Sequence, residues 1–170
     1  KATASIDKAV GKLTSSIGKS CGGVNKVCGD LGGNIAPDFE PTAADLGWPA
    51  QCPNFEKGDC TNPITTCGDI ATCLACIGGS ASDQAMTLFY DDINLQTADK
   101  ALNKCQVTIG KATSAYLNTS SKVLQKCWDA RINGKHVENC FSPDAGDGKY
   151  AAALAKAETK KVSSICKACG

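Results

Sequence analysis

Twelve cysteines in a chain of 170 residues constrain the fold more than any other feature of the sequence. Cysteine at this density is typical of secreted proteins and unusual in the reducing cytosol, where lasting disulfides are rare. The number is even, so that every cysteine has a potential partner. We therefore predict an extracellular protein in which all twelve form disulfides: Cys21, Cys28, Cys52, Cys60, Cys67, Cys73, Cys76, Cys105, Cys127, Cys140, Cys166 and Cys169.

Large apolar side chains are few, because the chain has four Phe, three Tyr, two Trp and one Met. Such a core buries little apolar area, and disulfides offset that deficit. The sequence begins at Lys1 and lacks both a signal-peptide pattern and an apolar run of about 20 residues. We expect an exported form without its signal peptide and without a membrane span. Basic and acidic residues number 18 and 17 and are interspersed, which argues against nucleic acid as the main partner.

Four stretches of the sequence have apolar residues at helical spacing. The pattern predicts an N-terminal helix within 1–21, two short helices within 67–95 of which the first ends at "GGS" (78–80), and two long helices that form an antiparallel hairpin over 98–169. Segment 22–66 holds five of the six prolines and seven glycines, so we expect it to be irregular. The predicted fold is one all-α domain over 1–170, a disulfide-stapled helical bundle.

The first and last predicted helices end on nearly the same phrase, "SSIGKSCG" and "SSICKACG". A gapless alignment of 9–22 with 157–170 matches eight of fourteen residues, which favours an internal duplication. The first helix then lacks the hairpin partner that precedes the last one, and Gly18 stands where Cys166 stands. The alternative is two unrelated Ala/Lys helices with similar ends.

The hairpin brings Cys105 near the end of the last helix, within disulfide distance of Cys166 or Cys169. Because the unpartnered copy has glycine in place of Cys166, we favour the pair Cys105–Cys166. Cys169 is then left for Cys73, Cys76 or a neighbouring molecule. At the other end of the hairpin we favour Cys127–Cys140.

"LQKCWDARINGK", a loop cysteine and "KAETKKVSSICKACG" resemble a helical-hairpin module in uncharacterised, exported Cys-rich repeat proteins of environmental bacteria. The resemblance covers about 98–170 and rests on the five cysteines of that region. It implies export, helices and tandem repetition. It implies no catalytic activity.

Two C-x-x-C pairs, Cys73/Cys76 and Cys166/Cys169, suggest a redox dithiol or zinc ligands. Neither is followed by the histidine of a haem attachment site, and no strand precedes either as in a thioredoxin-like context. The single histidine, His136, is expected to be a solvated loop residue without a nucleophile beside it. We therefore predict no enzyme activity, no cofactor and no metal, with structural disulfides as the role of the cysteines.

Three alternative functions are compatible with this sequence. The favoured one is an extracellular structural protein, which assembles with its own copies into a filament or surface layer through the N-terminal helix. The alternative is a secreted binding module for a carbohydrate or small ligand, with Phe39, Trp48 and Phe55 as the ligand surface. A weaker alternative is a redox or electron-transfer role for the C-x-x-C pairs.

Overall fold

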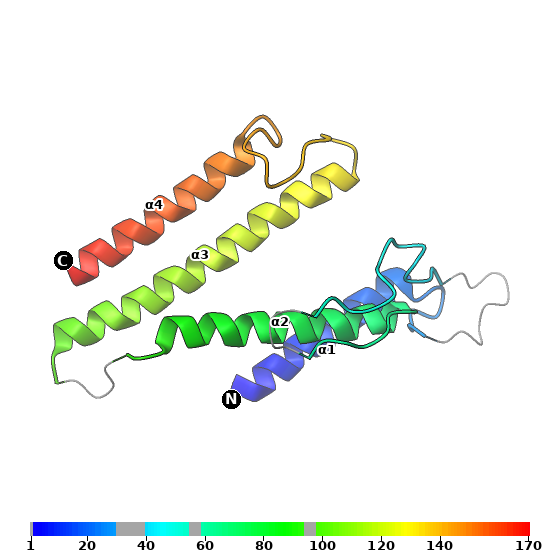
Figure 1. Cartoon of the computed structure of the whole chain (residues 1–170), viewed down its shortest axis with the longest axis horizontal. Helices are drawn as coiled ribbons and strands as arrows, with labels where there is room; N and C mark the ends of the chain where they lie inside the picture. The colour runs from blue at the N-terminus through cyan, green and yellow to red at the C-terminus, as the bar shows by residue number, and fades with distance from the viewer. Residues whose placement is uncertain (1, 30–39, 55–58, 94–97) are drawn as a thin grey trace. The chain divides into compact units, whose positions relative to one another are not determined.

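The computed structural model describes residues 2–29, 40–54, 59–93 and 98–170. The structure is all-α, with four helices in chain order and without strands in these ranges (Figure 1). The helices are α1 (Ala2–Cys21), α2 (Cys67–Tyr90), α3 (Lys100–Ile132) and α4 (Lys149–Cys169). The chain divides into two compact units, Lys1–Met86 and Thr87–Gly170. The predicted fold class is confirmed.

The first unit is organised around the beginning of α2. The residues on both sides of Gln51 pair with the segment before α2, through the backbone hydrogen bonds Cys52 N to Asn62 O and Ile64 N to Ala50 O, both 2.9 Å long. A small core forms beneath this contact, and half of its buried members are cysteines: Ala43, Cys52, Cys60, Ile64, Ile70 and Cys73. Backbone hydrogen bonds and buried cysteines therefore stabilise this part of the first unit in place of large apolar side chains.

Helix α2 differs from the two short helices that the sequence predicts. It is one helix of 24 residues and continues through Gly78 and Gly79, where we expected a helix end. A glycine inside a helix costs about 1 kcal/mol relative to alanine but does not prevent the helix. A Cβ added at either glycine would meet no atom within 4 Å, so both residues face open space. Three cysteines fix the first half of α2 to the irregular segment, which stabilises the helix on the N-terminal side of the glycines.

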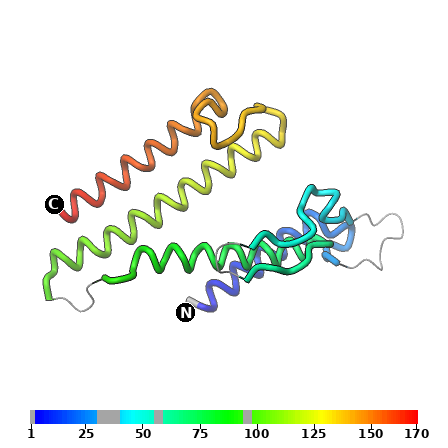
Figure 2. Tube along the Cα trace, viewed as in Figure 1, coloured from blue at the N-terminus to red at the C-terminus, as the bar shows by residue number. Residues whose placement is uncertain are grey.

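The second unit is the predicted antiparallel hairpin. Asp99 caps α3 by accepting hydrogen bonds from the N–H groups of Ala101 and Leu102 at 2.8 and 3.2 Å. Figure 2 follows the chain along α3, through the turn at 133–148 and back along α4. A small core lies near this turn and contains Cys127, Cys140, Ala145 and Tyr150. The predicted hairpin of two long helices over 98–169 is confirmed.

Candidate functional site

Three disulfides in the first unit join the irregular segment to α2: Cys28–Cys67, Cys52–Cys73 and Cys60–Cys76. The helix presents its three cysteines over about three turns, and each takes a partner from a different part of the segment. The C-x-x-C pair Cys73/Cys76 is therefore divided between two disulfides. It is not a dithiol that could close on itself.

Two disulfides join the hairpin, Cys127–Cys140 at the turn and Cys105–Cys169 at the opposite end. The turn pair is the one that the sequence favours. The predicted pair Cys105–Cys166 is wrong, because the helix register places Cys169 opposite Cys105, with their Cα atoms 4.7 Å apart. Cys166 lies three residues earlier on α4 and its side chain is exposed.

Two cysteines are free in the structure, Cys21 and Cys166, so the prediction that all twelve form disulfides is wrong for these two. The physical reason is the division of the chain. The first unit contains seven cysteines and the second five. Each of the five disulfides joins two cysteines of the same unit. An odd number in each unit leaves one thiol over in each. In the repeat alignment Cys21 corresponds to Cys169, so α1 has a free thiol where α4 has a bonded one.

Gly18 has a local reason to be glycine. It is buried, and a Cβ at this position would stand 2.8 Å from the carbonyl oxygen of Lys26, which belongs to the loop that folds back on the end of α1. Lys26 itself has a positive φ of 63°, and Gly22 N donates to Gly18 O at 2.8 Å within the same turn. Because Cys105 bonds Cys169 and not Cys166, the interpretation of Gly18 as the mark of a lost partner cysteine is wrong.

Of the three aromatic residues of the predicted ligand surface, Trp48 belongs to the described part of the chain. Trp48 packs against the core of the first unit together with Leu74 and Ile77. Its backbone N–H donates a hydrogen bond to Ala43 O at 2.9 Å. Phe39 and Phe55 lie outside the described residues. Trp48 thus covers part of this core.

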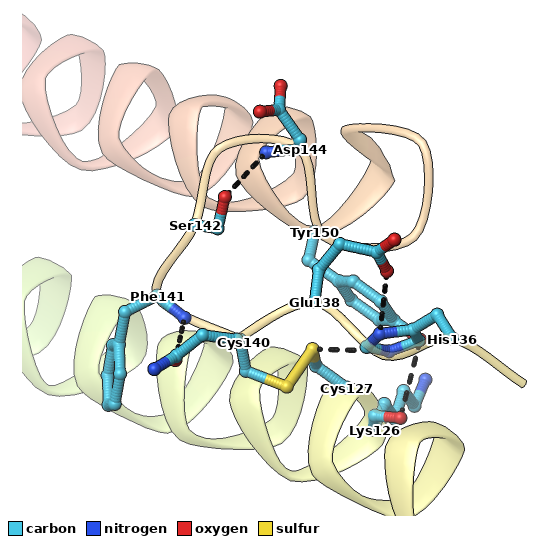
Figure 3. Close-up of polar contacts among 10 residues, drawn as sticks. Lys126, Cys127, His136, Glu138, Cys140, Phe141, Ser142, Asp144 and Tyr150 are labelled. Carbon is cyan, nitrogen blue, oxygen red and sulfur yellow. Dashed lines mark hydrogen bonds and ion pairs between the residues drawn. A yellow bond between two sulfur atoms is a disulfide. The ribbon is translucent and has the colours of Figure 1, made fainter. Parts of the chain in front are cut away.

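His136 is the largest difference between the predicted and the observed site (Figure 3). We expected a solvated residue, but its side chain is only 7% exposed. The imidazole packs 5.8 Å from the Tyr150 ring, its Nδ1 lies 3.2 Å from Glu138 Oε2, and its Nε2 lies 3.6 Å from Cys127 Sγ. The turn therefore brings a buried histidine and the two buried sulfur atoms of the Cys127–Cys140 disulfide together with the exposed carboxylate of Glu138.

One face of α1 is apolar and largely uncovered. Among its described side-chain positions Gly18 alone is buried, whereas Ile6 is 62% and Val10 39% exposed. These two side chains, with Ala9 and Leu13, form one wall of an open groove of about 390 Å³. The opposite wall is the exposed part of α2 around Gly78, Gly79 and Ser82. Small residues on that wall leave the apolar side of α1 accessible.

The beginning of α2 contains an acidic residue, Asp69, whose pKa is strongly lowered. Asp69 Oδ2 accepts hydrogen bonds from both the N–H and the hydroxyl of Thr65, and from the same two groups of Thr66, at 2.7 to 3.0 Å. These bonds favour the ionised form and lower the pKa of Asp69 to about 2, with Thr65 as the largest contributor. This carboxylate holds the helix end in place and has no catalytic partner in its hydrogen-bond set.

Comparison of the chain with protein-family models, with curated proteins and with solved structures finds no match. In the described part of the chain, no helix combines the length and apolar character that crossing a bilayer requires. Five disulfides are typical of proteins in oxidising compartments.

Proposed function

We propose that this protein is an extracellular structural subunit that assembles with copies of itself, through α1, into a filament or surface layer. The observation that carries the proposal is the α1 surface. A helix of 20 residues gains most of its stability from burying an apolar face, yet α1 buries one glycine among its described positions. A second chain that covers this face supplies the missing burial.

The groove between α1 and α2 supports the same proposal. Its volume of about 390 Å³ accommodates several aliphatic side chains, and both of its walls belong to the first unit. The second unit has exposed aliphatic side chains of its own on α3, including Leu102, Val107 and Leu117. A contact between α1 of one copy and α3 of the next joins two different surfaces. Each added copy then offers the same free surface again, so that a filament grows unless the rotation between neighbouring copies closes a ring.

Acidic substitutions on α1 test this function. Fully burying an Ile or Val side chain contributes about 1.5 to 3 kcal/mol, and more than half of Ile6 is still available for burial. We expect Ile6→Glu to weaken self-association at least about tenfold, since roughly 1.4 kcal/mol corresponds to that factor. Ser15→Glu is the matched control, because nine residues of helix place Ser15 on the opposite side of α1.

The measurements are light scattering after size exclusion and negative-stain imaging of the native protein. Assembly of the wild type and of Ser15→Glu, with loss of assembly in Ile6→Glu, supports the proposal. A monodisperse monomer of 17.5 kDa for the wild type across the accessible concentrations contradicts it, as does equal assembly of the two variants.

A further inference from the structure

The buried imidazole of His136 lacks strong hydrogen-bond partners. Among the described residues, Nδ1 has no hydrogen bond of acceptable geometry, although Glu138 Oε2 lies 3.2 Å away, and Nε2 faces a disulfide sulfur, which is a weak acceptor. A buried polar group without a good partner costs about 1 to 3 kcal/mol. Such a group in a folded protein calls for an explanation, and an ion is one of the known ones.

The spacing around His136 matches that of a metal centre. Tetrahedral zinc has Zn–S bonds of about 2.3 Å and Zn–N bonds of about 2.1 Å, so a sulfur and a nitrogen on the same ion stand about 3.6 Å apart. Nε2 of His136 and Sγ of Cys127 are 3.6 Å apart. The ligand atoms of Cys127, His136 and Cys140 all lie within 4.8 Å of one another.

Glu138 occupies the position of an outer-shell partner. Histidines that bind metals usually donate their second ring N–H to a carboxylate or carbonyl, which fixes the ring orientation. Here the carboxylate of Glu138 is beside Nδ1, and Nε2 is the nitrogen that faces the sulfur atoms (Figure 3). The arrangement therefore presents to Cys127 Sγ the ring nitrogen that is not beside the carboxylate.

We propose that, once the Cys127–Cys140 bond is reduced, Cys127, His136 and Cys140 bind a divalent metal ion of the zinc type. A small-molecule thiol or a phosphine supplies the two electrons that open the disulfide, and the two sulfurs become thiols. Zn²⁺ then binds them as thiolates with release of two protons, and water takes the fourth position. Two sulfurs bound to one tetrahedral ion stand about 3.8 Å apart, whereas an S–S bond is about 2.05 Å long. The disulfide and the metal therefore exclude each other, and either one closes the turn. This proposal is independent of self-assembly.

A second cluster in the chain provides an internal comparison. Cys28, Glu40 and Cys67 also place their ligand atoms within 4.8 Å of one another, and Cys28–Cys67 is likewise a disulfide. Its third member is already satisfied, because Glu40 Oε1 accepts a hydrogen bond from Gly29 N at 2.9 Å. We expect the metal to prefer the histidine cluster.

Oxidative refolding of the full chain tests the proposal. The reduced protein is reoxidised with a glutathione buffer, with and without Zn²⁺, and samples are alkylated at intervals and mapped by mass spectrometry. We expect Zn²⁺ to delay the Cys127–Cys140 bond at least about tenfold relative to Cys105–Cys169, and Glu138→Gln to reduce that delay, since outer-shell changes lower metal affinity about 10- to 100-fold.

The control variant is His136→Asn, in which the delay should disappear. In the reduced wild type, Zn²⁺ should also protect Cys127 and Cys140 from alkylation more than Cys28 and Cys67, a readout that needs no variant. Equal rates with and without the metal overturn the proposal, as does a uniform delay of all five bonds or an unchanged delay in His136→Asn.

Discussion

The disulfide at the open end of the hairpin should account for most of its stability. Cys105–Cys169 has a sequence separation of 64 and joins α3 to the last turn of α4, whereas the buried core of the unit lies near the other end, at the turn. We predict that the double variant Cys166→Ser/Cys169→Ser destabilises the hairpin by about 4 kcal/mol. Cys166 is removed as well so that it cannot replace Cys169.

This magnitude follows from the loop that the disulfide closes in the unfolded chain. The chain-entropy relation gives about 4.3 kcal/mol for the full separation. Cys127–Cys140 lies inside this loop and shortens it by roughly its own separation of 13, which lowers the value to about 4.1 kcal/mol because the dependence is logarithmic. A change of this size speeds amide exchange through unfolding about a thousandfold.

The single variant Cys169→Ser tests whether Cys166 can replace Cys169. Cys166 precedes Cys169 by three residues, which is an axial rise of about 4.5 Å and a rotation of about 60° around α4, so its Cα lies roughly 7 to 8 Å from that of Cys105. Disulfides form at Cα separations up to about 6.8 Å. We therefore expect Cys105 to stay a free thiol in this variant, with a loss of stability close to that of the double variant. Cys166→Ser alone removes an exposed free thiol and should change neither the linkages nor the stability.

Hydrogen exchange with mass spectrometry, read on peptides of α4, measures the effect within the second unit, and disulfide mapping identifies the linkages. The reasoning is refuted if α4 in the double variant exchanges less than about tenfold faster than in the wild type. It is equally refuted if Cys169→Ser retains full protection while Cys105 stays a free thiol, because stability would then not depend on the cross-link.

Two further predictions concern the first unit. The pKa of Asp69 in the folded protein is about 2, below its ordinary value of 3.8, so Asp69 stabilises the unit above about pH 4 and this contribution is lost as the pH falls toward 2. In thermal unfolding followed by circular dichroism, the melting temperature of Asp69→Asn should decrease less over this pH range than that of the wild type, and an equal decrease would contradict the assignment. Gly11→Ala should stabilise α1 by up to about 1 kcal/mol, whereas Gly18→Ala should destabilise it because of Lys26 O, and urea unfolding in which both variants gain stability would disprove the contact.

The helices could be predicted because their signal is local. Apolar spacing and a cap such as Asp99 identify α3 within a few residues. The helix end that we expected at Gly78 and Gly79 is absent from α2. Each glycine costs the helix about 1 kcal/mol, and the cross-links in the first half of α2 offset a cost of this size. A composition rule for helix ends gives a preference, and tertiary constraints override it.

The disulfide partner of Cys105 could not be derived from the sequence for an energetic reason. Loops to Cys166 and to Cys169 differ by three residues, which changes the chain entropy by less than about 0.1 kcal/mol. Helix register decides the pair instead, and register depends on how the turn at 133–148 folds. The burial of His136 has the same origin, because Cys140 and Tyr150 enclose it only when that turn is closed.

The disulfide core also explains why this chain has apolar side chains available for its surface. Six of the twelve buried apolar residues in the described ranges are half-cystines, and only Tyr150 among the twelve is aromatic. A cross-linked core needs fewer large side chains, because part of the entropy cost of folding is removed from the unfolded state. Large apolar residues such as Ile6 and Val10 are therefore not required inside, and their exposure on one face of α1 leaves that face free for the contact proposed above.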